Sequence, residues 1–191
     1  MELFPEYTSL TKSSPPLPLA ARMRPDSLEK YFGQEHLIGK GLPLRELVET
    51  ESGLSFILWG PPGSGKTTLA RIAAKLTESV FHEISAVNAG VADIRKVVQS
   101  ATQIWKTKGS RTILFLDEIH RFNKVQQDAI LPFVENGTIR LIGSTTENPS
   151  FEVIPALRSR CQIFRLEVLD RGSIRNIVLS ALNDKENGLG E

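Results

Sequence analysis

Short runs of apolar residues alternate along the chain with segments whose apolar residues recur every three or four positions. The apolar runs predict strands, and the segments of helical spacing predict helices. We expect strands at residues 54–59, 80–85, 111–116, 139–144 and 162–166, and helices at residues 44–51, 66–77, 91–107, 124–135 and 172–184. This alternation predicts an α/β fold in which helices flank a five-stranded parallel sheet and ligands bind at the carboxyl ends of the strands.

The two ends of the chain differ from this middle part. Residues 1–18 combine prolines with several serines and threonines, which predicts a flexible N-terminal arm. Residues 19–168 hold the alternating strands and helices, and we expect them to form one α/β domain. Residues 169–191 contain one predicted helix with little else to pack against, so we expect the beginning of a second unit that is cut short.

The composition narrows the class of protein. The chain has 191 residues and is 40% apolar, which is enough for the core of one α/β domain. Its net charge is +1, so any nucleic acid would have to bind a local basic patch. The lone cysteine, Cys161, excludes an internal disulfide and is typical of a reducing compartment. Without an apolar run of membrane-spanning length or a signal pattern, we expect a cytoplasmic protein with no membrane partner.

Residues 60–67 read Gly-Pro-Pro-Gly-Ser-Gly-Lys-Thr, the pattern of a phosphate-binding P-loop, between a predicted strand and a predicted helix. Glycines let backbone N–H groups bend around phosphate oxygens, and the helix N-terminus adds positive charge. We expect Lys66 to reach the β- and γ-phosphates and the Thr67 hydroxyl to bind Mg²⁺. The residues assigned to nucleotide binding here are Gly60, Pro61, Pro62, Gly63, Ser64, Gly65, Lys66, Thr67 and Thr68.

A second strand ends in two acidic residues. The apolar run at residues 112–116 is followed directly by Asp117 and Glu118. A carboxylate at the tip of a strand beside a P-loop can hold Mg²⁺, the role we expect for Asp117, and Glu118 would then polarise the attacking water. Acidic residues also end strands as ordinary turn residues, but the P-loop upstream favours the catalytic interpretation.

Two later segments supply further candidates. A polar residue after the strand at 139–144 would face the γ-phosphate, and Thr146 is our candidate, although threonine is also a common residue of strand ends. Arg160 lies on a short turn or helix before the last strand. It is a candidate arginine finger, which in a ring of ATPases contacts the nucleotide of the neighbouring subunit. The alternative is a surface ion pair.

Together these motifs resemble the AAA+ ATPases, and most closely the replication-associated recombination protein A family (RarA or MgsA), of the clamp-loader clade. The eukaryotic relative of that family is the Werner helicase interacting protein. The most specific segments are residues 19–25, 33–37, 117–124, 126–129 and 145–151. The resemblance implies an AAA+ P-loop NTPase core at residues 19–168 and the start of a helical lid at 169–191, so that the chain is truncated.

The same resemblance assigns a role to each candidate. It implies the Walker A residues Lys66 and Thr67, the Walker B residues Asp117 and Glu118, the sensor Thr146 and the arginine finger Arg160. It adds two segments that surround the adenine, one with Met23, Arg24 and Pro25 and one with Gly33 and Gln34. The implied cofactors are ATP and Mg²⁺, and the implied assembly is a homo-oligomer, a tetramer in the family. The family's C-terminal assembly domain lies beyond residue 191, so we expect this chain alone to hydrolyse ATP weakly.

The segment after the second predicted strand helps to indicate whether such an ATPase acts on polypeptides or on DNA. Residues 85–90 lack the aromatic residue of a polypeptide-threading pore loop and instead resemble the clamp-loader pattern, in which small residues lead into a helix that faces DNA. Arg95 and Lys96 lie on the polar side of that helix and are our candidates for contacts with DNA phosphates. A solvated helix face is an equally good interpretation.

We therefore expect a DNA-stimulated ATPase that acts at stalled forks, gaps or DNA ends, with single-strand binding protein and replisome components as partners. A clamp-loader subunit or a Holliday-junction branch-migration motor would share the same core. A further alternative is a scaffold that binds ATP to recruit replication proteins and hydrolyses it slowly. DNA-stimulated turnover would separate the scaffold from the other two.

Overall fold

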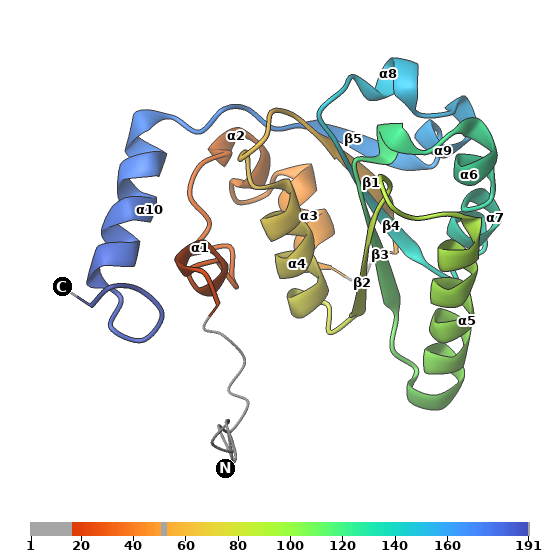
Figure 1. The fold of residues 1–191 in the computed structure, drawn as a ribbon, viewed down its shortest axis with the longest axis horizontal. Coiled ribbons are helices and arrows are strands. Elements are labelled where there is room, and N and C mark those ends of the chain that lie inside the picture. The colour runs from red at the N-terminus through yellow and green to blue at the C-terminus, as the bar shows by residue number, and fades with distance from the viewer. Residues whose placement is uncertain (1–16, 51–52, 191) are drawn as a thin grey trace, which may run out of the picture.

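A parallel five-stranded sheet forms the centre of the molecule (Figure 1). The computed structural model describes residues 17–50 and 53–190. The strands are β1 (Ser55–Trp59), β2 (Val80–Ser85), β3 (Thr112–Asp117), β4 (Arg140–Thr145) and β5 (Cys161–Arg165). Each boundary lies within one residue of the predicted one, and the predicted α/β class is confirmed.

The order of the strands across the sheet is β2-β3-β4-β1-β5, and each neighbouring pair is parallel. The strand that comes first in the chain therefore lies inside the sheet, between β4 and β5, while the second strand lies at an edge. In open α/β sheets such a reversal of strand order creates a crevice at the carboxyl ends of the strands, and ligands bind there. The P-loop leaves β1 at this position.

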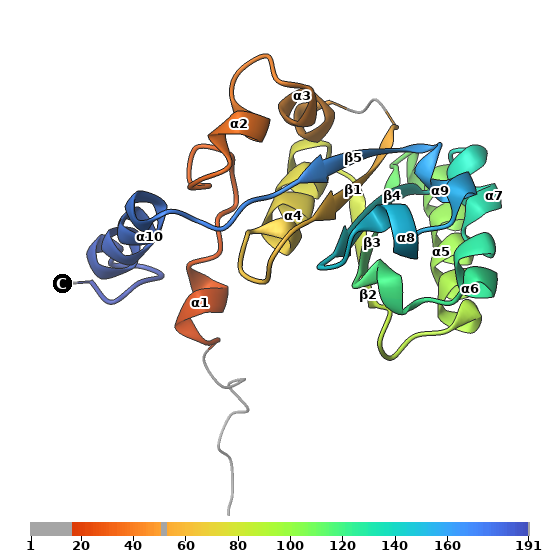
Figure 2. The same cartoon turned by 90° about the horizontal axis from the view of Figure 1, so that it is seen from above.

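Helices cover both faces of the sheet (Figures 1 and 2). On one face lie α3 (Pro43–Glu49) and α4 (Lys66–Leu76), and on the other lies α5 (Val91–Lys108). The shorter helices are α1 (Leu19–Arg22), α2 (Glu35–Ile38), α6 (Lys124–Asp128), α7 (Leu131–Glu135), α8 (Pro149–Glu152) and α9 (Pro155–Arg158). The last helix, α10 (Arg171–Asn183), lies apart from the sheet beyond α1 (Figure 2).

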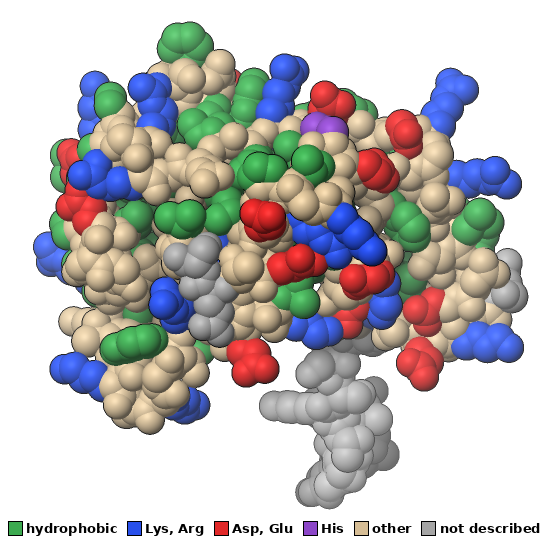
Figure 3. All heavy atoms as spheres, turned by 180° about the vertical axis from the view of Figure 1, so that it is seen from behind, with side chains coloured by type: hydrophobic (Ala, Val, Ile, Leu, Met, Phe, Trp, Pro, Cys, Tyr) green, Lys and Arg blue, Asp and Glu red, His purple; other side chains and the backbone are tan. Residues whose placement is uncertain are grey.

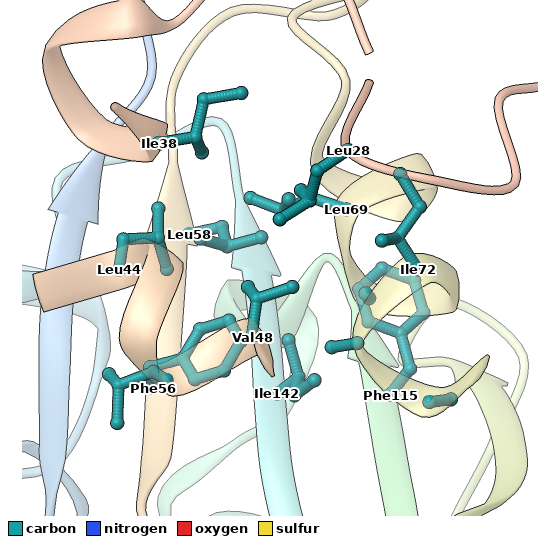
Figure 4. Packing of buried hydrophobic residues seen from close by; sticks show 14 of the residues in the cluster. Leu28, Ile38, Leu44, Val48, Phe56, Leu58, Leu69, Ile72, Phe115 and Ile142 are labelled. Carbon is teal, nitrogen blue, oxygen red and sulfur yellow. The ribbon is translucent and has the colours of Figure 1, made fainter. Parts of the chain in front are cut away.

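The alternation of side chains along each strand divides the core into two parts. In β1, Phe56 and Leu58 point toward α3 and α4, whereas Ile57 points toward α5. Figure 4 shows the first part, in which residues of the central strands meet Leu44 and Val48 of α3. All three of β1, β3 and β4 are buried between the two helical layers. The sequences of β1 and β3 therefore read as nearly continuous apolar runs, whereas β4 also buries Arg140, Ser144 and Thr145.

The chain between β3 and β4 forms two short helices where the sequence predicts one. The single helix predicted at residues 124–135 is wrong, because the structure has α6 and α7 with a break at Ala129 and Ile130. Pro132 has no N–H to donate to the carbonyl of Asp128, and its ring would crowd that carbonyl in a continuous helix. Of the predicted N-terminal arm, residues 1–16 lie outside the described part of the chain.

Candidate nucleotide-binding and catalytic site

The loop between β1 and α4 depends on glycine at two positions. Gly60 and Gly65 have φ angles of 156° and 97°. A Cβ atom on Gly60 would lie 2.3 Å from the carbonyl oxygen of Leu166, and one on Gly65 would lie 2.3 Å from the hydroxyl oxygen of Tyr31. A Cβ atom would therefore collide at both positions, and glycine lets the backbone of the loop adopt a bend of the kind that surrounds a phosphate.

Lys66 begins α4 and turns back into this loop. Its ammonium donates hydrogen bonds to the carbonyl oxygens of Gly60 (2.8 Å) and Pro61 (2.9 Å), and the residue is buried. Burial lowers the pKa of Lys66, while the nearby carboxylates of Glu118 and Asp117 raise it. The loop thus holds the Lys66 ammonium near two carboxylates. A bound nucleotide would place its negative phosphates next to this ammonium, and Mg²⁺ would offset the charge of the phosphates and carboxylates.

Ser64 provides an independent indication of a ligand in the loop. Its hydroxyl oxygen is buried and has no hydrogen-bond partner among the described residues. Buried polar groups are nearly always hydrogen-bonded, because leaving one unpaired costs about 1–3 kcal/mol. A phosphate oxygen in the loop would supply an acceptor for this hydroxyl, so the chain's own residues fit a bound nucleotide.

The acidic residues lie at the carboxyl end of β3, next to β4. Ser144, which is fully buried in β4, donates its hydroxyl hydrogen to Oδ1 of Asp117. The same hydroxyl oxygen accepts the backbone N–H of Glu118 at 3.4 Å. Glu118 has a left-handed backbone, with φ 55° and ψ 48°, and so the chain turns sharply at the tip of the strand. Ser144 therefore holds both acidic residues at the carboxyl ends of the strands, where the P-loop also lies.

The two threonines at the end of β4 have different surroundings. Thr146 donates a hydrogen bond to Oε2 of Glu118 at 3.4 Å. The Thr145 hydroxyl is buried and accepts the backbone N–H of Glu147 at 3.0 Å. Thr146 is thus the threonine of the two whose hydroxyl contacts Glu118, and its role as a sensor of the γ-phosphate stays a prediction.

The donors available for Mg²⁺ are oxygens of separate residues. Within residues 17–50 and 53–190, no group of three or more His, Cys, Asp and Glu side chains could hold a metal ion. Mg²⁺ in ATPases is usually bound by one or two protein oxygens together with phosphate oxygens and water. The Thr67 hydroxyl on the first turn of α4 and the Asp117 carboxylate provide oxygens of that kind.

A cavity of about 620 Å³ lies beside the loop. Its walls come from residues 22–26 and 30–32, from Gly63, Ser64, Gly65 and Thr68, and from α10 and the residues that flank it. Arg24 and Pro25 are among these wall residues, and their contact with adenine stays a prediction. The volume lies in the range of ordinary small-molecule sites, roughly 300–1,000 Å³.

Tyr31, which the sequence prediction missed, and Gln34 tie this wall to the P-loop through the carbonyl oxygen of Ser64. The Tyr31 hydroxyl donates to the carbonyl oxygen of Ser64 at 3.2 Å, and burial raises its pKa well above the usual range. The Gln34 amide donates to the carbonyl oxygen of Glu167 at 2.8 Å. Asp26, whose pKa is lowered to about 2 by hydrogen bonds from Lys75 and Lys30, anchors the segment to α4.

Comparison with known proteins decides the family. Residues 56–167 match the family described as "ATPase family associated with various cellular activities (AAA)". The chain belongs to this family. Together with the strand order of the sheet, this confirms the predicted P-loop core.

Among curated proteins, the chain is similar to replication-associated recombination protein A. It is 51% identical over 174 residues to the protein of Haemophilus influenzae, which covers 91% of this chain and 39% of that protein. It is 44% identical over 184 residues to the ATPase WRNIP1 of Dictyostelium discoideum, which covers 95% of this chain and 21% of that protein. The resemblance inferred from the motifs is confirmed, and the chain spans about two fifths of the length of the bacterial relatives.

Among solved structures, the chain is similar to the Holliday junction branch migration motor RuvB of Thermotoga maritima. The TM-score is 0.68 with 30% identity, over 85% of this chain and 54% of that one.

Arg160 lies outside the AAA nucleotide cavity of its own chain. Its guanidinium pairs with Glu135 of α7 and donates to the carbonyl oxygen of Ala156 (3.2 Å) and the hydroxyl oxygen of Ser159 (2.8 Å). The structure therefore brings Lys66, Asp117, Glu118 and Thr146 together at the carboxyl ends of the strands. Arg160 lies apart from them.

Arg95 and Lys96 are exposed on α5, which covers the face of the sheet opposite α4. Lys96 forms an ion pair with Asp93, at 3.1 Å between Nζ and Oδ1. On the side of the molecule seen in Figure 3, Lys and Arg side chains alternate with Asp and Glu and form no continuous basic field.

Within the described residues, no helix combines the length and apolarity needed to cross a lipid bilayer.

Proposed function

We propose that this chain is the nucleotide-binding part of a DNA-stimulated ATPase that acts in replication-associated recombination and repair, in the cytoplasm where chromosomal DNA is found. The observation that carries the proposal is the alignment of the acidic pair with the P-loop, since Ser144 fixes Asp117 and Glu118 beside the buried ammonium of Lys66. Hydrolysis of a phosphoanhydride needs these groups and little else from a protein. Similarity to replication-associated recombination protein A supports the cellular process.

Each residue has a distinct task in this proposal. Lys66 would exchange its bonds to Gly60 and Pro61 for β- and γ-phosphate oxygens, while Thr67 and Asp117 would bind Mg²⁺. When bound, the metal ion neutralises the charge that develops on the phosphate oxygens. Glu118 would accept a proton from the attacking water, and Thr146 would donate a hydrogen bond to the γ-phosphate.

The wall of the cavity would bind the base. Arg24 and Pro25 would lie against the adenine of ATP, because they face the same cavity as the loop residues Gly63 and Thr68. The hydrogen bonds of Tyr31 and Gln34 to the carbonyl oxygen of Ser64 would hold this wall in a fixed position relative to the P-loop.

We also propose that Arg160 acts in trans, in a homo-oligomer of the full-length protein. Its exposed side chain lies apart from the cavity of its own chain, which is what a residue that serves the neighbouring subunit requires. Arg95 and Lys96 would contact DNA phosphates without regard to sequence. Single-strand binding protein and the replisome would be the protein partners. Residues 19–168 would form the catalytic domain and residues 169–191 would begin the lid.

A branch-migration motor is the second candidate, because the solved structures of RuvB share this fold at 30% identity. The higher identity to replication-associated recombination protein A, 51% over 91% of the chain, favours the first proposal.

ATP turnover by the full-length protein tests the proposal. Hydrolysis should be measured alone and with single-stranded DNA, duplex ends, a fork and a four-way junction. We expect stimulation by gaps, ends or forks, and we expect Glu118→Gln to bind ATP but to turn it over very slowly, because an amide cannot accept the proton. ATP binding without DNA-stimulated turnover would favour the scaffold, and selective stimulation by the junction would favour the branch-migration motor.

A further inference from the structure

His120 lies against Glu118, although the proposed reaction gives it no task. Its Nδ1 atom is 3.1 Å from Oε2 of Glu118 and 3.0 Å from the hydroxyl oxygen of Thr145. The His120 side chain is only 11% exposed, and that of Glu118 is 30% exposed. A hydrogen-bonding group so close to the catalytic carboxylate and so shielded from water can influence the orientation of that carboxylate strongly.

The backbone around His120 is firmly held. His120 is the middle residue of the short 3-10 helix Ile119–Arg121. Ile119 is fully buried and Phe122 is 2% exposed, and both belong to the part of the core beneath α5. These two anchors hold the backbone at His120, so its contact with Glu118 starts from a fixed position in the core.

The neighbouring hydrogen bonds assign a proton to Nδ1 of His120. The Thr145 hydroxyl donates to the carbonyl oxygen of Glu147 at 3.2 Å, so its hydrogen is already used. Nδ1 then faces two acceptors, the hydroxyl oxygen of Thr145 and Oε2 of Glu118. Only a protonated Nδ1 satisfies both, because an unprotonated nitrogen would be an acceptor beside acceptors.

Oε2 of Glu118 therefore has two donors, His120 and Thr146. In the proposed function, Thr146 turns its hydroxyl hydrogen toward the γ-phosphate when ATP binds, and it then no longer donates to Glu118. His120 would remain as the side-chain donor to Oε2 among the described residues. A carboxylate without such a donor is free to rotate away from the attacking water.

We propose that His120 is a positioning residue that holds Glu118 in the orientation for proton transfer after Thr146 has engaged the nucleotide. This inference rests on the proposed function of Glu118. It predicts that losing the Nδ1 donor slows turnover and leaves ATP affinity unchanged, because Nδ1 of His120 contacts Glu118 and Thr145 and not a residue assigned to nucleotide binding. Loss of a residue that orients a catalytic group commonly costs about tenfold to a hundredfold.

Three substitutions separate the Nδ1 donor from the bulk of the ring. The amide nitrogen of asparagine is two bonds from Cβ, as Nδ1 is, whereas the amide nitrogen of glutamine lies one bond further. In the full-length protein we expect His120→Asn to keep most of the wild-type kcat, and His120→Gln and His120→Leu to lower it about tenfold or more. KM for ATP and the affinity for a fluorescent ATP analogue should stay unchanged in all three. His36→Leu, which removes a histidine on α2 instead, is the matched control and should keep wild-type kcat.

The ¹⁵N resonances of the His120 ring give a readout that needs no activity. In the wild type they should report a protonated Nδ1, and Glu118→Gln should shift that resonance because an anionic acceptor has been replaced by a neutral one. A wild-type protein that binds no ATP would overturn the proposed function, whereas an Nδ1 resonance unmoved by Glu118→Gln would overturn the contact itself. Wild-type turnover in a folded His120→Leu variant would overturn the positioning role. Equal loss in His120→Asn and His120→Leu, with both folded, would also overturn it.

Discussion

The guanidinium of Arg160 and the carboxylate of Glu135 form an ion pair within one chain, with 2.5 Å between Nη2 and Oε1. Both side chains are partly open to water, at 43% and 41% exposure. Exposed pairs of this kind contribute about 1 kcal/mol or less, so separating them costs little. Arg160 is therefore held close to its own chain by a contact that a phosphate of a neighbouring subunit could replace.

We predict that Arg160→Ala in the full-length protein binds ATP normally and loses ATP turnover by on the order of 10³-fold. Turnover should return in part when this variant is mixed with Lys66→Ala, because a subunit with an intact P-loop can then meet an intact Arg160. Arg158→Ala, two residues away and bonded to the carbonyl oxygen of Ser150, is the control and should keep most of the turnover. Mixed, well-folded variants that recover nothing would argue against action in trans.

A second prediction concerns the P-loop lysine. Lys66→Ala removes the cation that would face the β- and γ-phosphates, so tight ATP binding should be lost. Fluorescence titration with an ATP analogue measures this directly. Arg71→Ala removes a cation from the exposed side of the same helix, where it pairs with Glu83, and should bind the analogue like the wild type. Equal affinity of Lys66→Ala and the wild type would refute the assignment of the loop.

The strands could be predicted from the sequence because burial on both faces leaves a continuous signal. Residues 56–58 and 113–116 are entirely apolar and fully buried. The helix predicted at 124–135 failed because helical spacing of apolar residues continues across α6 and α7 although Pro132 interrupts the backbone. Periodicity reports which residues face the core, and it does not report whether the backbone hydrogen bonds are continuous.

The four-residue helices were missed for a different reason. A helix of four residues is about one turn long and shows no repeat of its apolar positions. For α8 a local signal did exist, since Asn148 accepts the backbone N–H of Ser150 and Pro149 is the first helical residue. An N-cap followed by proline is typical of a helix start and would have predicted this element.

The candidate site was predicted where its residues belong to short motifs and was missed where contacts are distant in sequence. Lys66, Asp117 and Glu118 belong to motifs that can be read directly. Tyr31 contacts Ser64 across 33 positions of the chain, and His120 contacts Thr145 across 25. Nothing in the composition near Tyr31 or His120 indicates those partners, because they follow from the order of strands in the sheet.

The third prediction tests the proposed DNA contacts with a control on the same helix. Arg95→Glu combined with Lys96→Glu should weaken binding to single-stranded DNA and reduce the dependence of affinity on salt. The reason is that a protein that contacts fewer phosphates releases fewer counterions from the DNA when it binds. Lys106→Glu combined with Lys108→Glu makes the same change of charge at the other end of α5. If the pair at 95 and 96 forms the contact, only the first double variant changes the salt slope. Equal effects of the two variants would indicate a general effect of charge, and no effect would return Arg95 and Lys96 to the solvated surface.

The last prediction concerns the stability of the sheet. Arg140 is 5% exposed and donates hydrogen bonds to the carbonyl oxygens of Leu47 (2.6 Å) and Leu54 (2.8 Å), which ties the start of β4 to α3 and to the segment before β1. The Arg140→Met variant keeps a side chain of similar length but loses the guanidinium that donates these hydrogen bonds, which should lower the free energy of unfolding by about 2–4 kcal/mol.

Urea denaturation measures this change, with Arg111→Met as the control. Arg111 is exposed and stacks over Trp105 at 6.0 Å, so its loss should cost less than about 1 kcal/mol. Burial lowers the pKa of Arg140 to about 10. The folded pKa is thus below the unfolded one, and the proton-linked part of stability changes only as the pH rises through about 10. Between pH 6 and 8 the guanidinium is charged in both states, so the difference between Arg140→Met and the wild type should be constant there. A difference that varies across that range, or one no larger than that of Arg111→Met, would mean that the buried hydrogen bonds of Arg140 do not hold β4 to α3.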